Sequence, residues 1–370
     1  MKNCHLKALS LNNYRNFTDL RLEFTNKPII IIGENGSGKT NILESISLLS
    51  PGKGLRQAKF DDICNSYQNN WHSNFIMESK LGIAEITTNY TKAPRSRKIV
   101  YNSSKIASLE LTKLVNIIWL TPQMDGIFLG SSSNRRKFLD RIVYNFENKH
   151  AKNVSNYEHY SRERLKMLQE DIMEPSWLGH LEEKMAMLAK EITFNRNKVI
   201  DFMQQAIDNL DSKFPKAELA VSKLITENID FESDFIDYYK EKLQQGRQKD
   251  KLSNRTNFGV HRVDFLVYYP QRDNMLAKFC STGEQKAMLI SIIISEIEAI
   301  KQKAKLAPIL LLDELFVHLD DVRKNYLIEF VLNSGLQSFI TATDINDIKE
   351  LSKHSQIVKL AAKIGVCEYG

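Results

Sequence analysis

A glycine-rich stretch at residues 33–40 has the residue types and the spacing of a phosphate-binding loop. It reads GENGSGKT and matches the pattern GxxxxGK[ST] in full. An apolar run ending at Ile32 precedes it and helical spacing follows from Asn41, so the loop joins an expected strand to an expected helix. Such a loop points backbone N–H groups at phosphates, and the following helix adds its dipole. The sequence predicts a nucleotide site built from Gly33, Glu34, Asn35, Gly36, Ser37, Gly38, Lys39 and Thr40.

The side chains that would carry the chemistry lie in this loop and in a second segment. We expect the Lys39 ammonium to reach the β- and γ-phosphates of ATP and the Thr40 hydroxyl to bind Mg²⁺. The run ILLLDE at 309–314 suits a buried parallel strand that ends in two carboxylates. Asp313 would hold the Mg²⁺ shell through water, and Glu314 would polarise the attacking water. The predicted catalytic residues are therefore Lys39, Asp313 and Glu314, and the predicted magnesium ligands are Thr40 and Asp313.

A third segment, CSTGEQK at 280–286, directly precedes the apolar run AMLISIIISEIEAI. Ser281 followed three residues later by Glu284 forms a capping box, which predicts a helix N-terminus. The segment also resembles the LSGGQ or LSGGE signature of ABC-type ATPases, and it lies upstream of the DE strand, as in that family. The resemblance implies that Ser281 and Gly283 face a γ-phosphate held by another subunit, so that ATP joins two heads as a homodimer.

The elements around these motifs come from both ends of the chain. Strand patterns occupy residues 4–32 and 75–120 and return at 263–269 and 309–312, whereas residues 134–248 have long helical stretches with few glycines. We therefore predict an α/β fold with a two-lobed ATPase head from residues 1–125 and 255–370, and a helical lid domain inserted between them at residues 126–254.

Four strings resemble motifs of the RecF family of bacterial recombination mediators, and the resemblance covers nearly the whole chain. They are LNNYRNF at 11–17, GENGSGKTNILESI at 33–46, NRRKFLD at 134–140 and GVHRVD at 259–264. The family motif corresponding to the last string is GPHRDD, so Val260 and Val263 depart from it, and His261 and Arg262 are assigned no catalytic role. The resemblance implies a P-loop NTPase of ABC/Rad50-head type with a helical lid.

The resemblance also implies further nucleotide contacts. Arg15 and Asn16 stand where related heads contact the nucleotide, with an ordinary surface turn as the alternative. Gln123 follows the expected strand VNIIWL and lies near the position of a Q-loop residue that senses Mg²⁺.

The charge of the chain favours a polyanionic partner. The formal net charge is +6, and the sequence pI is about 8.9. Residues 87–109 carry five basic residues and no acidic one. From these and the second cluster near residue 135, the DNA-binding candidates are Lys92, Arg95, Arg97, Lys98, Arg135 and Arg136. The alternatives are a solvated surface and, for Arg135 and Arg136, anchoring of the lid through carboxylates such as Asp140. Contacts of this kind read DNA shape, such as a duplex or the junction of a duplex with a single strand.

These features define an expected function and its rivals. The resemblance implies an ATP-driven homodimer that clamps DNA in recombinational repair and replication restart, with weak DNA-stimulated ATP hydrolysis, RecR and RecO as partners, and a role in loading recombinase at gaps. With no CxxC pair and no run of about 20 apolar residues, we expect a cytoplasmic protein with no membrane association. A transporter ATPase subunit is disfavoured because ITATD at 340–344 lacks the switch histidine, and an SMC/Rad50-like structural clamp because no long heptad run exists.

Overall fold

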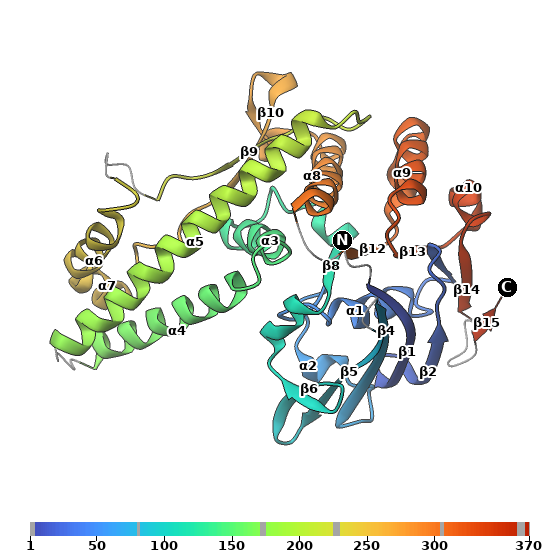
Figure 1. Ribbon diagram of the computed structural model, residues 1–370, viewed down its shortest axis with the longest axis horizontal. Helices are drawn as coiled ribbons and strands as arrows, with labels where there is room; N and C mark the ends of the chain where they lie inside the picture. The colour runs from blue at the N-terminus through green and yellow to red at the C-terminus, as the bar shows by residue number, and fades with distance from the viewer. Residues whose placement is uncertain are drawn as a thin grey trace. The chain divides into compact units, whose positions relative to one another are not determined.

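The computed structural model describes residues 4–79, 82–170, 175–224, 230–303, 307–360 and 367–369. The chain divides into two compact units (Figure 1). Unit 1 comprises Met1–Asp125, Asp211–Phe214 and Ile297–Gly370, and unit 2 comprises Gly126–Leu210 and Pro215–Glu296. The sequence assigned residues 255–296 to the head, whereas this division groups them with the helices of unit 2. Within the described ranges, no helix combines the length and the apolar character needed to cross a membrane.

A mostly parallel sheet forms one half of unit 1. Its strand order is β15-β14-β3-β13-β12-β8, and all neighbours are parallel except β15. Strands β3, β8, β12 and β13 are almost wholly buried, as the sequence predicted for β3 and β12, because both faces of the central strands of a parallel sheet are covered. The strands are β3 (Ile29–Ile32), β8 (Asn116–Leu120), β12 (Pro308–Leu312), β13 (Ser338–Ala342), β14 (Gln356–Leu360) and β15 (Cys367–Tyr369), and the accompanying helices include α1 (Lys39–Ser47), α9 (Asp321–Asn333) and α10 (Lys349–Ser352).

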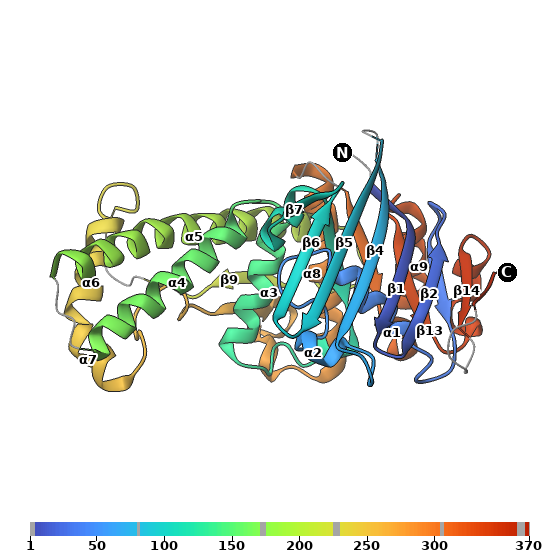
Figure 2. The same cartoon turned by 90° about the horizontal axis from the view of Figure 1, so that it is seen from below.

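An antiparallel sheet with the order β2-β1-β4-β5-β6-β7 forms the other half of unit 1 (Figure 2). Its strands alternate between buried and exposed residues, with Trp71 and Phe75 in the core. The Gln337 amide joins this sheet to the parallel one, because it accepts from Leu6 N at 2.7 Å and donates to Leu6 O at 2.9 Å. The elements are β1 (Cys4–Tyr14), β2 (Phe17–Glu23), α2 (Phe60–Ile63), β4 (Asn70–Ser79), β5 (Gly82–Lys92), β6 (Arg95–Tyr101) and β7 (Ser104–Ile106).

Unit 2 is built on two long helices, α4 (His150–Gln169) and α5 (Pro175–Asn209), which pack side by side (Figure 1). A core around Tyr157, Met185 and Phe235 holds α6 against them. A small antiparallel sheet in the order β11-β10-β9 completes the unit. Its strand β9 lies within the region that the sequence predicted to be helical. The other elements are α3 (Ser132–Tyr144), β9 (Glu218–Val221), α6 (Phe235–Gln245), α7 (Arg247–Ser253), β10 (Phe265–Tyr269) and β11 (Met275–Leu276); α8 (Thr282–Lys303) starts in unit 2 and ends in unit 1.

Candidate nucleotide-binding site

The glycine-rich loop joins β3 to α1, as the sequence predicted. Gly36 and Gly38 have φ angles of 84° and 105°, which side-chain-bearing residues rarely adopt. A Cβ atom at Gly38 would also lie 2.5 Å from Phe17 Cζ. The loop conformation and its packing on Phe17 therefore both require glycine at position 38.

The Lys39 side chain is buried within the loop. Its Nζ donates to Gly33 O at 2.7 Å and to Glu34 O at 3.1 Å, and it lies 3.9 Å from Glu314 Oε1. Burial lowers the pKa of Lys39, while Glu314 and Asp313 act in the opposite direction. The ammonium thus lies between the loop that would hold phosphates and the carboxylate pair that follows β12.

Asp313 is the centre of a hydrogen-bonded cluster at the carboxyl ends of the parallel strands. Thr40 Oγ1 donates to its two carboxylate oxygens at 3.0 and 3.1 Å, and Thr341 Oγ1 donates to Oδ1 at 2.8 Å. Thr341 Oγ1 also accepts from Glu314 N at 2.9 Å, which fixes the backbone of Glu314 at a left-handed φ of 46°. Parallel register explains the convergence, since Leu312 pairs with Ile340 and Thr341 pairs with Ile31. The sequence placed Thr341 in the ITATD string at 340–344 but gave it no role at the site.

Arg15 and Asn16 support the loop from the turn between β1 and β2. Arg15 donates to both carboxylate oxygens of the fully buried Glu44 on α1, at 2.8 and 2.6 Å. Asn16 Nδ2 donates to Ser37 O at 3.2 Å, and Asn16 Oδ1 accepts from Asn41 Nδ2 at 2.7 Å. These contacts give both residues a structural role beside the loop, and a direct nucleotide contact stays a prediction.

Gln123 is exposed in the 3₁₀ turn Pro122–Met124, two residues after β8. Since β8 neighbours β12 in the sheet, this turn lies in unit 1 with the loop and the carboxylate pair. Its sensing role stays a prediction.

The capping box at the start of α8 is confirmed within unit 2. Ser281 N and Ser281 Oγ donate to Glu284 Oε2 at 2.9 and 2.8 Å, and Glu284 N lies 3.4 Å from Ser281 Oγ. Ser281 and Gly283 are exposed, and a Cβ atom added to Gly283 would meet nothing within 4 Å. This helix end is therefore accessible to a ligand or to another chain.

The basic residues of unit 1 differ in how far they are available to a partner. Arg97 is held inside the unit: it donates to Thr88 Oγ1, Gly52 O and Leu48 O, and burial lowers its pKa to about 10. Lys92 Nζ donates to Gln68 O at 3.0 Å. Arg95 and Lys98 are exposed, although Arg95 pairs with Asp61 from α2 at 3.1 Å. Arg95 and Lys98 are thus the stronger candidates for DNA contacts.

Arg135 and Arg136 join the RRKFLD and GVHRVD strings inside unit 2. Arg135 makes two hydrogen bonds to Asp264, at 2.8 and 2.7 Å, and two more to the carbonyls of Phe128 and Gly130. Arg136 donates to Val263 O at 2.8 Å. These contacts anchor both arginines within unit 2, through Asp264 and backbone carbonyls and not through Asp140, and their role in DNA binding stays a prediction.

The carboxylate that the sequence offered to these arginines, Asp140, has other partners. It pairs with Arg196 and His150 instead. Burial raises the pKa of Asp140, yet Arg196 and the His150 hydrogen bond outweigh burial and lower it to about 2. Asp140 is therefore an ionised carboxylate committed to the core of unit 2.

The glycine loop between β3 and α1 and the carboxylate pair after β12 are features of a P-loop ATPase head of the ABC/SMC type. The family model described as "RecF/RecN/SMC N terminal domain" matches residues 5–364. The chain is 53% identical over 361 residues to "DNA replication and repair protein RecF" of Rickettsia felis, which covers 97% of this chain and 99% of the relative. This chain belongs to the RecF family.

Solved structures agree on the fold. The structure of "the recombination mediator protein RecF-ATP in RecFOR pathway" is 23% identical, has a TM-score of 0.89 and covers 100% of both chains. The Smc head domain of Pyrococcus furiosus, with an extended coiled coil and bound to part of ScpA, is 15% identical, with a TM-score of 0.57 over 99% of this chain and 96% of that one. The predicted fold class is therefore confirmed.

Proposed function

We propose that this chain is an ATP-dependent DNA-binding protein of recombinational repair and replication restart, in which ATP closes a homodimer around DNA. The observation that carries the proposal is the convergence of Lys39, Thr40, Asp313 and Glu314 at the ends of the parallel strands. The relative from Rickettsia felis is a DNA replication and repair protein, RecF, and this supports the biological role.

The residues at this site fit ATP with Mg²⁺. Thr40 Oγ1 lies 3.0 and 3.1 Å from the two carboxylate oxygens of Asp313, and oxygen is the ligand atom that Mg²⁺ prefers. Bound there, the ion would neutralise phosphate charge. Lys39 would exchange its loop carbonyls for phosphate oxygens, and Glu314, with its backbone fixed by Thr341, would accept hydrogen bonds from the attacking water.

The homodimer is proposed because the signature-like segment 280–286 of one copy and the phosphate loop 33–40 of the other would together enclose one ATP. The α8 N-terminus exposes Ser281 and Gly283, and N-terminal N–H groups with a favourable dipole bind phosphate oxygens. We propose that this end meets the γ-phosphate held by the loop of a second copy. Slow hydrolysis, stimulated by DNA, would then open the dimer.

DNA and protein partners complete the proposal. The basic excess and the exposed residues Arg95 and Lys98 suit phosphate contacts on a duplex or at a junction with a single strand. The RecF–ATP structure is of a protein of the RecFOR pathway, and this supports RecR and RecO as partners in recombinase loading. An SMC/Rad50-like structural clamp is the weaker alternative, because α4 and α5 are only 20 and 35 residues long.

Sedimentation with and without ATP and gapped DNA tests the proposal directly. We expect monomers without nucleotide, dimers with ATP and a faster-sedimenting complex when DNA is added. Lys39→Ala should bind no ATP and stay monomeric, whereas the control Lys53→Ala, at an exposed loop position, should behave as wild type. A wild-type chain that stays monomeric at saturating ATP and DNA would overturn the dimer mechanism.

A further inference from the structure

The first turn of α8, where we propose that a γ-phosphate binds, carries the negative charge of Glu284. Glu284 lies in the first turn of α8, and its Oε2 atom accepts two hydrogen bonds from Ser281. The hydrogen bonds from Ser281 are the main reason that the pKa of Glu284 is lowered, so the group is an anion at neutral pH. A carboxylate in this place stabilises the helix end, but it repels a second anion there.

Arg272 supplies the opposing charge from a different element. It ends the 3₁₀ turn Pro270–Arg272 after β10, and its Nε donates to Glu284 Oε1 at 2.9 Å. The next two residues, Asp273 and Asn274, have φ angles of 49° and 54° and form the reversal into β11. The hairpin thus turns Arg272 back onto the start of α8, and the two carboxylate oxygens of Glu284 are divided between Arg272 and Ser281.

The Ser281 hydroxyl has only one proton, and Glu284 accepts it. To bind a phosphate, the Ser281 hydroxyl must donate its hydrogen bond to a phosphate oxygen in place of Glu284 Oε2. Without the hydrogen bond from Ser281, the Glu284 carboxylate would repel the phosphate unless another group kept it paired. Arg272 is placed to keep Glu284 paired through this exchange.

We propose that Arg272 is a positioning residue of the signature: it neutralises and holds Glu284, so that Ser281 and the α8 N-terminus can accept the γ-phosphate carried by a second copy. This inference rests on the proposed function, and it explains how Glu284 can lie beside a bound phosphate: Arg272 neutralises its charge. Arg272 acts through its ion pair with Glu284.

The test compares Arg272→Gln, Glu284→Gln and the double variant with wild type. Lys166→Gln is the matched control, since it removes one lysine charge from an exposed ion pair on α4. ATP-driven dimerisation is followed by sedimentation, ATP binding to the monomer by titration with a fluorescent analogue, and folding by thermal melting. Glutamine also completes a capping box, so Glu284→Gln should keep the helix end intact.

Arg272→Gln should weaken ATP-driven dimerisation by about tenfold, the size expected for one uncompensated charge close to an anion near the protein surface. ATP binding to the monomer should not change, because Gly33–Thr40 is untouched. The loss should grow at low salt, where the screening length is longer. Glu284→Gln should restore dimerisation to Arg272→Gln, because the charge that needed neutralising is gone.

Two results would overturn the inference while the proposed function stands: Arg272→Gln dimerises like wild type, or the double variant is as defective as Arg272→Gln although it melts like wild type. The latter would mean that the ion pair only supports the hairpin. If wild type itself does not dimerise with ATP, the proposed function fails and the inference fails with it.

Discussion

The Thr341 hydroxyl joins the carboxylate of Asp313 to the backbone of Glu314. It donates to Asp313 Oδ1 and accepts from Glu314 N, and it lies at the end of β13. One hydroxyl therefore fixes both the proposed magnesium ligand and the backbone of the proposed base. Alignment of a base by hydrogen bonds contributes to the rate of reaction more than to substrate affinity.

Thr341→Val removes both hydrogen bonds and should lower the rate of ATP hydrolysis by about tenfold or more, where each tenfold corresponds to about 1.4 kcal/mol. ATP affinity of the monomer should change little, because Lys39 and the loop glycines are untouched. Steady-state hydrolysis and nucleotide titration measure the two quantities. Thr343→Val, two residues further at an exposed position, is the control. Equal turnover in wild type and Thr341→Val would remove Thr341 from the site.

The sequence revealed those site residues that lie in local strings and missed those that depend on strand order. The loop, Asp313 and Glu314 could be found because an apolar run stops at each of them. Thr341 is a common residue in a common strand, and only the pairing of β13 between β3 and β12 brings it to Asp313. Arg15 was named from the resemblance, but its ion pair with the fully buried Glu44 was not, because only the fold brings the β1–β2 turn to α1.

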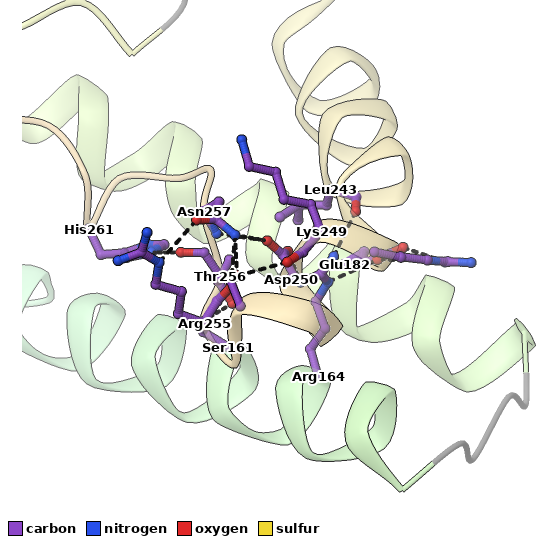
Figure 3. Close-up of polar contacts among 12 residues, drawn as sticks. Ser161, Arg164, Glu182, Leu243, Lys249, Asp250, Arg255, Thr256, Asn257 and His261 are labelled. Atoms are coloured by element: carbon purple, nitrogen blue, oxygen red, sulfur yellow. Dashed lines mark hydrogen bonds and ion pairs between the residues drawn. The ribbon is translucent and has the colours of Figure 1, made fainter.

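At the scale of elements, a buried ion-pair network centred on Arg164 joins the helices of unit 2 (Figure 3). Arg164 of α4 donates to Glu182 of α5 at 2.9 Å, to Asp250 of α7 at 2.7 Å and to Leu243 O at the end of α6 at 2.6 Å. Asp250 Oδ1 also accepts from Asn257 N and Nδ2, so the network continues into the loop before GVHRVD.

Arg164→Met should destabilise unit 2 by about 3–5 kcal/mol, because it leaves two buried carboxylates without their shared cation. Arg247 still pairs with Glu182 at 2.6 Å, so Asp250 should suffer most. Chemical denaturation measures the free energy of unfolding. Lys166→Gln, on the same helix but exposed, should cost less than about 1 kcal/mol. A loss no larger than that of the control would mean that the network adds nothing to stability.

The packing of α3 against α8 predicts a pH dependence. Burial raises the pKa of Glu296 on α8 from 4.5 to about 7, although Arg141 and the Asn145 hydrogen bond, both from α3 or its end, oppose burial. Between pH 4.5 and pH 7 the folded chain keeps a proton that the unfolded chain has lost. Stability contributed by this group therefore falls as pH rises through that window, by about 3 kcal/mol, and stays lower above it.

Glu296→Gln should remove this fall, since glutamine does not ionise. Unfolding free energies at pH 5 and pH 8 should show the variant gaining stability relative to wild type at the higher pH by about 3 kcal/mol. Glu298→Gln, on the same helix and paired with Lys301, is the control. An identical pH profile for wild type and Glu296→Gln would contradict the buried, protonated carboxyl.

Elements with strong periodicity were predicted, and those fixed by distant partners were not. The capping box located the start of α8 because both of its hydrogen bonds are local. Strand β9 was missed, since its four residues are a strand only through pairing with β10, more than 40 residues later. Arg135 likewise meets Asp264 across a separation of 129 residues, which no local pattern encodes.

At the scale of the whole molecule, the proposed cycle depends on Glu314 being the group that ends the ATP-bound state. Its side chain is 37% exposed and lies 3.9 Å from Lys39 Nζ, while its backbone is fixed by Thr341. Glutamine has the same shape but cannot accept a proton from water. Glu314→Gln should therefore keep ATP binding and dimerisation while stopping the step that opens the dimer.

Glu314→Gln should consequently remain on gapped DNA as an ATP-bound dimer, with dissociation slowed by about tenfold or more, because opening now requires ATP release instead of hydrolysis. Competition with unlabelled DNA, followed by fluorescence anisotropy, measures the dissociation rate. Glu350→Gln, an exposed partner of Lys353, is the control and should leave DNA like wild type. Raised salt should speed release for both, because phosphate contacts are screened. If Glu314→Gln leaves DNA faster than wild type with ATP present, Glu314 does not activate water, and opening of the clamp is driven by some other step than hydrolysis.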